Sequence, residues 1–219
     1  MRIAFYNPPA PNPIIRRYMC SYNAGANLYP NIELLTLAAD ARAQGHTVAY
    51  IDCIAENLNT REGITQTRRW GAEMLVGICG LECFRDDVAE LRALKAAFPE
   101  VSVGLCGYYP TLYPERCLQE GFDFVLLGEG EPGLEALLQG QLSSPGLATP
   151  GHINPPAARL SARQFKERRF YRAFYTSPAG IRTGLRTLLK DPRRALQATL
   201  EVLRFTVADK GGHSHPDYL

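Results

Sequence analysis

Glycine-containing turns follow three apolar runs in the middle of the chain. They are Cys79-Gly80 after M-L-V-G-I, Cys106-Gly107 after V-S-V-G-L, and Gly128-Glu129-Gly130 after F-D-F-V-L-L. Because glycine has no side chain, the atoms of a ligand can come close to the backbone at such turns. When the runs are parallel strands, the turns meet at the carboxyl edge of one sheet, where such sheets hold cofactors. The sequence therefore predicts a cofactor-binding edge built from these turns.

The segments that must position these turns alternate between strand-like and helical patterns. Five strands are predicted, at Ile3–Tyr6, Thr47–Asp52, Met74–Ile78, Val101–Leu105 and Phe124–Leu127. Helices are predicted at Ile32–Gln44, Arg85–Phe98 and Pro132–Gln139. With right-handed crossovers, this order gives an α/β fold with a five-stranded parallel, doubly wound, flavodoxin-like (Rossmann-like) sheet.

The chain divides by composition into an α/β domain and a basic helical part. We predict a domain at 1–140, a linker at 141–160 rich in Ser, Pro and Gly, a helical appendage at 161–212, and a disordered tail at 213–219. The long segment from Asn7 to Pro30 is predicted to be a functional or disordered loop. More than half of the 24 lysines and arginines follow residue 158, whereas most of the 22 acidic residues precede it.

The remaining composition is that of an ordinary globular protein. No apolar run approaches the roughly 20 residues that cross a bilayer. The amino terminus reads as a strand rather than a secretory signal, so we expect a cytoplasmic protein. The six cysteines lie mostly in or beside apolar runs, which favours reduced, buried thiols over disulfides: Cys20, Cys53, Cys79, Cys83, Cys106 and Cys117.

The order and spacing of several motifs resemble one family. L-Y-P-x-x-E-L-L-x-L-A-A-x-A-R-x-x-G-H-x-V-x-x-I-D runs from Leu28 to Asp52, and V-G-I-C-G, G-Y-Y-P-T-L-Y-P-E and L-G-E-G-E follow it. Over roughly residues 1–140, the chain resembles the amino-terminal cobalamin-binding domain of cobalamin-dependent radical SAM enzymes. The resemblance implies a flavodoxin-like domain that binds cobalamin.

The chain also departs from this family. The fourth strand usually ends G-G-x-H-P-T, but here Cys106 and Tyr109 replace the first glycine and the histidine. Radical SAM chemistry needs C-x3-C-x2-C, and after Cys79-x3-Cys83 the third position is Asp86. Since an open-iron cubane needs three cysteine ligands, we predict no 4Fe-4S cluster. The basic aromatic segment near the carboxyl terminus is similar to the tail of some family members, as if the catalytic middle were excised.

The resemblance assigns cofactor-binding residues to each strand end. The corrin floor would be Cys79, Gly80, Leu81 and Glu82, although an ordinary βα turn explains the same residues. The slot for the nucleotide tail would be walled by Gly107, Tyr108, Tyr109, Pro110, Thr111 and Pro114, which could instead be a proline-rich surface loop. Asn7, Pro8 and Pro9 would end the first strand beside the switch point of the sheet. No catalytic or metal-binding residues are predicted.

The backbone amides of Gly128, Glu129 and Gly130 would close the other side of the slot, at the start of a helix. Glu131 is not assigned to the cofactor, because a favourable interaction with the helix dipole explains an acidic residue at this position. Mutase- and methionine-synthase-type cobalamin domains carry D-x-H-x-x-G after the first strand, and its histidine ligates cobalt. No D-x-H occurs here. We therefore predict base-off cobalamin with no protein histidine on the metal.

Three functions fit these features. The first is a cobalamin carrier, store or auxiliary subunit for a separate radical SAM or methyltransferase protein. The second is a light or ligand sensor that signals through its basic carboxyl-terminal helices to a nucleic acid or protein partner. Residues 159–210 could also contact a nucleic acid or a membrane surface. There arginines alternate with aromatic residues, but a helix packed on the α/β domain has the same pattern. The third is an enzyme that transfers an alkyl group with bound cobalamin. A degenerate domain that no longer binds the cofactor is a further alternative.

Overall fold

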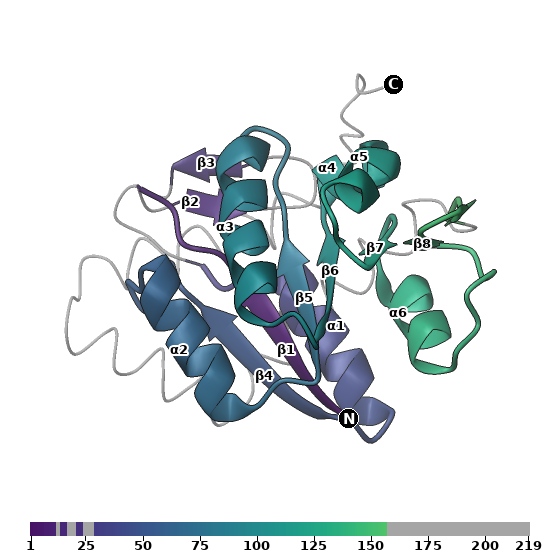
Figure 1. The fold of residues 1–219 in the computed structure, drawn as a ribbon, viewed down its shortest axis with the longest axis horizontal. Helices are drawn as coiled ribbons and strands as arrows, with labels where there is room; N and C mark the ends of the chain where they lie inside the picture. The colour runs from purple at the N-terminus through teal and green to yellow at the C-terminus, as the bar shows by residue number, and fades with distance from the viewer. Residues whose placement is uncertain (12–13, 17–20, 24–28, 157–219) are drawn as a thin grey trace, which may run out of the picture. The chain divides into compact units, whose positions relative to one another are not determined.

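The computed structural model describes residues 1–11, 14–16, 21–23 and 29–156 of the chain (Figure 1). The chain separates into one compact unit at Met1–Arg159 and a second at Leu160–Leu219. The predicted basic helices at 161–212 and the predicted tail at 213–219 lie outside the described residues. The proposed contacts of residues 159–210 with a membrane, nucleic acid or partner therefore stay predictions.

A mostly parallel sheet forms the centre of the first unit. Its strand order is β4-β1-β5-β6-β7-β8-β9. The first five of these strands are parallel, which confirms the predicted flavodoxin-like arrangement. Their bounds are β1 Arg2–Asn7, β4 Thr47–Asp52, β5 Met74–Ile78, β6 Ser102–Cys106 and β7 Phe124–Leu126.

Two further strands lie in the segment that the sequence predicted to be linker. They are β8 at Leu147–Thr149 and β9 at His152–Asn154, and they extend the sheet antiparallel beyond β7. The linker prediction is wrong for these residues because Leu147 and Ala148 are completely buried and pair with β7. Strands of three residues are too short for periodicity to reveal, and the Ser, Pro and Gly around them suggested a loop.

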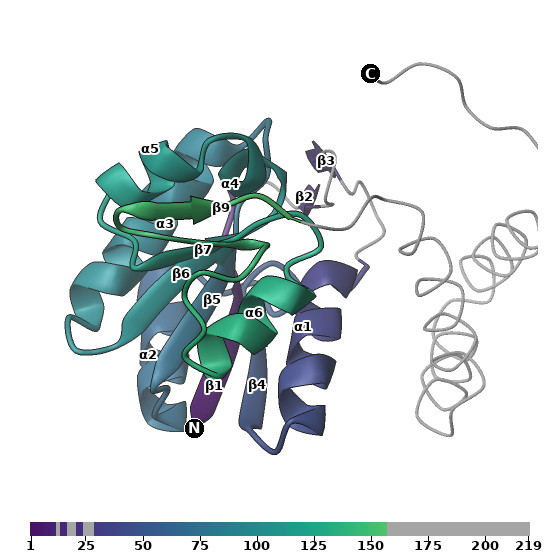
Figure 2. The same ribbon diagram turned by 90° about the vertical axis from the view of Figure 1, so that its right-hand side faces the viewer.

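Helices cover both faces of the sheet (Figure 2). On one face lie α1 at Ile32–Ala43 and α6 at Glu131–Leu138, and on the other lie α2 at Thr60–Trp70 and α3 at Phe84–Ala97. Helix α1, predicted at Ile32–Gln44, is capped by the side chain of Asn31, which accepts a hydrogen bond from the Leu34 amide at 2.9 Å. Among the described residues, no helix is long and apolar enough to cross a membrane.

Three helices and a hairpin were not predicted. Helix α2 is largely polar and starts at a capping box between Asn59 and Glu62. Two short helices, α4 at Tyr108–Leu112 and α5 at Pro114–Gln119, follow β6. In the predicted loop from Asn7 to Pro30, β2 at Ile14–Arg16 pairs antiparallel with β3 at Ser21–Asn23.

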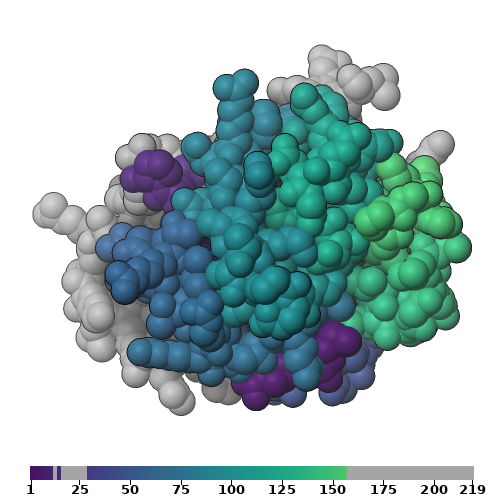
Figure 3. Space-filling view, viewed as in Figure 1, coloured from purple at the N-terminus to yellow at the C-terminus, as the bar shows by residue number. Residues whose placement is uncertain are grey.

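Helices α2, α3 and α5 form one continuous face of the unit (Figure 3). Arg92 on α3 pairs with Glu120 at the end of α5, 2.9 Å apart. Lys95 pairs with Asp123, which precedes β7, at 2.6 Å. The five described cysteines form no disulfide with one another, and all except the half-buried Cys83 are buried. The two ion pairs therefore connect α3 to the segment between β6 and β7.

Candidate functional site

The carboxyl edge of the parallel strands brings the predicted site segments together. The strand order reverses between β1 and β5. After β1 the chain adds β4 on one side of it, and from β5 onwards it adds β6 and β7 on the other side. Such switch points are where open α/β sheets bind ligands. Tyr6 pairs with Gly77, and Ile78 pairs with Cys106, so the loops that follow β1, β5 and β6 start side by side.

Asp87 fixes the loop after β5, which was assigned to the corrin floor. One of its carboxylate oxygens, Oδ2, accepts hydrogen bonds from the Gly80 amide at 2.8 Å and from the Cys83 thiol at 3.0 Å. Asp87 is completely buried in the first turn of α3. Leu81 is left half-buried and Glu82 exposed. Asp87 was not predicted as a site residue, because an acidic residue in the first turn of a helix usually indicates only a favourable interaction with the helix dipole.

Gly107 joins the β6 loop to the β5 loop. Its φ is +112°, and a Cβ there would lie 2.5 Å from the carbonyl oxygen of Cys79. The amide of Cys79 also donates to the carbonyl of Cys106 at 2.9 Å. Only glycine satisfies both the backbone angle and the close approach. The two loops therefore form one connected surface.

The residues assigned to the wall of the nucleotide slot form α4 and the start of α5. Tyr109, Pro110 and Pro114 are buried, and the ring of Tyr109 stacks on Phe84 with centroids 4.3 Å apart. Tyr109 therefore packs in the core on the α2 and α3 side of the sheet. Tyr108 is half-buried.

Thr111 connects the β6 loop to the β7 loop. Its hydroxyl donates to the carbonyl oxygen of Gly107 at 2.8 Å and accepts from the Gly128 amide at 3.0 Å. The hydroxyl proton is therefore already engaged within the protein. Thr111 was assigned to the wall of the nucleotide slot, and its hydroxyl bridges the β6 and β7 loops.

The β7 loop turns through two glycines in left-handed conformations, with φ of +68° at Gly128 and +79° at Gly130. The Gly130 amide donates to the Leu127 carbonyl at 3.3 Å, and the Gly128 amide is held by Thr111. Two of the three amides predicted to close the slot thus have partners in the protein. Glu129 is half-buried, and its Oε1 is a buried atom with no hydrogen-bond partner among the described residues.

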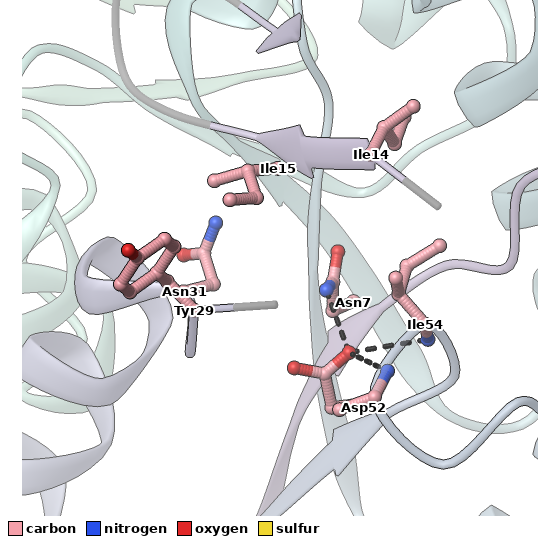
Figure 4. Close-up of a pocket in the computed structure, with 8 residues that line it drawn as sticks. Asn7, Ile14, Ile15, Tyr29, Asn31, Asp52 and Ile54 are labelled. Carbon is pink, nitrogen blue, oxygen red and sulfur yellow. Dashed lines mark hydrogen bonds between the residues drawn. The ribbon is translucent and has the colours of Figure 1, made fainter. Parts of the chain in front are cut away.

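A polar network fixes the ends of β1 and β4 (Figure 4). Oδ1 of Asp52 accepts from the side chain of Asn7 at 2.8 Å and from the amides of Ile54 and Ala55 at 3.1 and 3.0 Å. Oδ2 accepts from the hydroxyl of Tyr50 at 2.5 Å, and that hydroxyl accepts from the Asn31 amide at 3.0 Å. Burial, together with the charge of Asp52, raises the pKa of Tyr50 above its ordinary value.

The pocket beside this network is too small for a cofactor. Its volume is about 10 Å³, which is room for about one water molecule. It lies between the strand ends and β2, as Figure 4 shows. The lining residues are Asn7, Ile14, Ile15, Tyr29, Asn31, Asp52, Ile54 and Ala55. Asp52 and its partners therefore serve to hold the loops after β1 and β4 in place.

The two described histidines lie at the other edge of the sheet. His46 directly precedes β4, and His152 begins β9 and pairs with Thr149 at the end of β8. Because β8 runs against β7, Thr149 lies beside the amino end of β7. His213 and His215 lie outside the described residues. Neither described histidine is at the edge where the glycine turns meet.

Comparison with known protein families identifies the domain. Residues 24–138, more than half of the 219-residue chain, match the family model of the B12 binding domain. The chain therefore belongs to the B12-binding domain family. This confirms the family resemblance seen in the sequence, including the flavodoxin-like fold. No curated protein matches the chain.

Solved structures with a similar fold include the cobalamin-dependent S-adenosylmethionine radical enzyme OxsB. Its structure with aqua-cobalamin and S-adenosylmethionine bound is similar at a TM-score of 0.56 and 15% identity, over 73% of this chain and 22% of OxsB. The structure with aqua-cobalamin alone gives 0.55 and 15%, over 72% and 22%. The chain thus spans about a fifth of the length of OxsB, and the likeness is one of fold.

Proposed function

We propose that the chain binds cobalamin across the carboxyl edge of its sheet and acts as a carrier or auxiliary subunit for a radical SAM or methyltransferase protein. Membership of the B12-binding domain family supports cobalamin as the ligand. The fold shared with OxsB, whose structure contains aqua-cobalamin, supports the same ligand.

The residues at this edge fit the chemistry of cobalamin. A corrin ring is a broad, mostly apolar disc with amide groups around its rim. The connected turns at Cys79 and Gly107 carry no bulky side chain, and the half-buried Leu81 and Tyr108 adjoin them. The orphaned Oε1 of Glu129 offers an acceptor on the next loop. An apolar floor with a few polar groups at its margin is the usual composition of such a site.

We further propose that the cofactor binds base-off, with no protein histidine on cobalt. Support comes from the positions of His46 and His152 at the opposite edge of the sheet. Bound cobalamin would supply a cobalt centre able to carry an alkyl group. The chain itself would hold the corrin by the β5 and β6 loops and restrict water beneath it with Leu81.

The carrier role is favoured over catalysis by the use of the two buried carboxylates at this edge. Asp52 accepts four hydrogen bonds from protein groups, and Asp87 accepts from the Gly80 amide and the Cys83 thiol. A general acid or base has to reach a proton of the substrate. Both carboxylates hold loops in place, as in a binding scaffold, and their engagement is the main support for a carrier role.

Titration with aqua-cobalamin tests the binding. We expect purified protein to retain the cofactor through gel filtration, with an altered visible spectrum. Failure to retain it would refute the proposed function. The reduced Co(II) complex tests the coordination, because a lower nitrogen ligand splits the cobalt lines of the electron paramagnetic resonance spectrum into triplets. We expect lines without this splitting, and a triplet that changes in ¹⁵N-labelled protein would identify a protein histidine instead.

The carrier role needs its own assay. Loaded protein would be mixed with an apo methyltransferase or radical SAM protein that depends on cobalamin, and cofactor in each protein would be measured after separation. We expect transfer to be faster than from free cobalamin at the same concentration. Equal rates from both sources would contradict a carrier.

A further inference from the structure

The loop after β7 offers an acceptor where donors were expected. The amides of Gly128 and Gly130 already donate to Thr111 and to Leu127. The side chain of Glu129, between them, supplies two carboxylate oxygens. An ionised carboxylate accepts hydrogen bonds and cannot donate one. This loop is therefore suited to a ligand group that donates.

Oε1 of Glu129 is the atom that this ligand group would reach. It is buried and has no hydrogen-bond partner in the described part of the chain. Buried polar atoms in proteins nearly always have a partner, and an unpaired one is costly. A bound molecule with a hydrogen-bond donor would satisfy this atom.

We propose that Glu129 accepts a hydrogen bond from an uncharged donor of bound cobalamin. This rests on the proposed function. The nucleotide tail carries a phosphodiester, which a carboxylate repels. Uncharged donors occur as the amides around the corrin, including the amide that links the nucleotide tail, and as the hydroxyls of the ribose. Glu129 therefore selects for the amide or hydroxyl groups of the cofactor and keeps the phosphate away from the start of α6.

Binding measurements on Glu129→Ala test the proposal. The ligands are aqua-cobalamin and diaquacobinamide, which keeps the corrin amides but lacks the ribose and phosphate. The matched control is Glu135→Ala, which also removes a glutamate side chain but from an exposed position on α6, where that side chain accepts a hydrogen bond from Gln139. Since a hydrogen bond to a charged group is lost, we expect Glu129→Ala to weaken cobalamin binding about tenfold or more. Glu135→Ala should stay within about twofold of wild type, since exposed charges contribute little.

The two ligands separate the two donors. Equal weakening for both ligands assigns the donor to a corrin amide, and weakening for cobalamin alone assigns it to the ribose. Glu129→Ala that binds both ligands as wild type does would overturn the proposal and leave cobalamin binding intact. Wild-type protein that binds neither ligand would instead refute the proposed function.

Stability without cofactor provides the second measurement. If Oε1 has no partner in the protein, its removal leaves no group newly unpaired. The free energy of unfolding of cofactor-free Glu129→Ala should then equal or exceed that of wild type. A clear loss of stability would show that Glu129 already has a partner in the protein, and would contradict the proposal.

Discussion

The amide of Gly128 donates a hydrogen bond to the hydroxyl oxygen of Thr111 at 3.0 Å, and so joins the loops after β7 and β6. The same hydroxyl donates to the carbonyl of Gly107. One side chain thus links the turns at two neighbouring strand ends, both of which belong to the candidate site.

Thr111→Val should separate these loops. Valine has nearly the same shape but neither donates to Gly107 nor accepts from Gly128, so the Gly128 amide loses its partner. We expect the free energy of unfolding to fall by about 1–3 kcal/mol, measured by urea denaturation. Thr111→Ser keeps the hydroxyl and is the control. Equal losses in both variants would mean that the methyl group, rather than the bridge, matters.

Asp87→Ala should loosen the β5 loop. The Gly80 amide and the Cys83 thiol both lose their acceptor. We expect a loss of about 2–4 kcal/mol of unfolding free energy, and faster reaction of Cys83 with a thiol reagent. Asp86→Ala, which removes an exposed carboxylate from the same helical turn, should change stability by less than about 0.5 kcal/mol. Similar effects at both positions would point to the helix dipole instead.

Gly107→Ala and Gly121→Ala form a matched pair. Both glycines have positive φ, +112° and +93°, but a Cβ at Gly107 would meet the Cys79 carbonyl at 2.5 Å, whereas nothing lies within 4 Å at Gly121. We expect Gly121→Ala to cost about 1–2 kcal/mol, from backbone strain alone. Gly107→Ala should cost clearly more in a thermal unfolding experiment. Equal costs would show that the β5 loop can move away.

Alkaline pH should weaken the fold through Cys117. Burial raises the pKa of this thiol from 9.0 to about 12, so the folded state keeps its proton where the unfolded state loses it. Its contribution to stability is full below pH 9 and declines as the pH rises towards 12. The slope from one such group is at most about 1.4 kcal/mol per pH unit. Unfolding free energies of wild type and Cys117→Ala across this range should converge, and parallel curves would contradict the assignment.

The parallel strands could be predicted because they are apolar runs, three of which end in glycine turns. Helix α1 could be predicted from its cap at Asn31. Helix α2 was missed since few of its residues are apolar, although the capping box at Asn59 and Glu62 was a usable signal. Helices α4 and α5 were missed because Pro110 and Pro114 suggest a loop, whereas Pro114 in fact occupies the first position of α5.

The candidate site was predicted as a set of loops but not as a set of contacts. The turns lie at one edge because the strands are parallel, and the alternation of strands and helices in the sequence predicts parallel strands. The partners of Asp52 and Asp87 depend on which loops lie beside them in three dimensions. Asp87 was missed because a buried carboxylate that holds an amide cannot be distinguished by sequence from an exposed one at a helix start. Asp52 was missed because it lies at the end of β4, where its polar side chain only marks the end of the strand.

The backbone of Gly107 packs so closely on the Cys79 carbonyl that no Cβ fits between them, and the Cys79 amide donates to the Cys106 carbonyl, so the ends of β5 and β6 are coupled. Neither turn can change its course without displacing the other, so their surface has its final form before any ligand arrives. A large flat molecule that docks on it loses its own freedom of movement but demands little ordering from the protein. Loosening this junction should therefore appear first as faster release of whatever the surface holds.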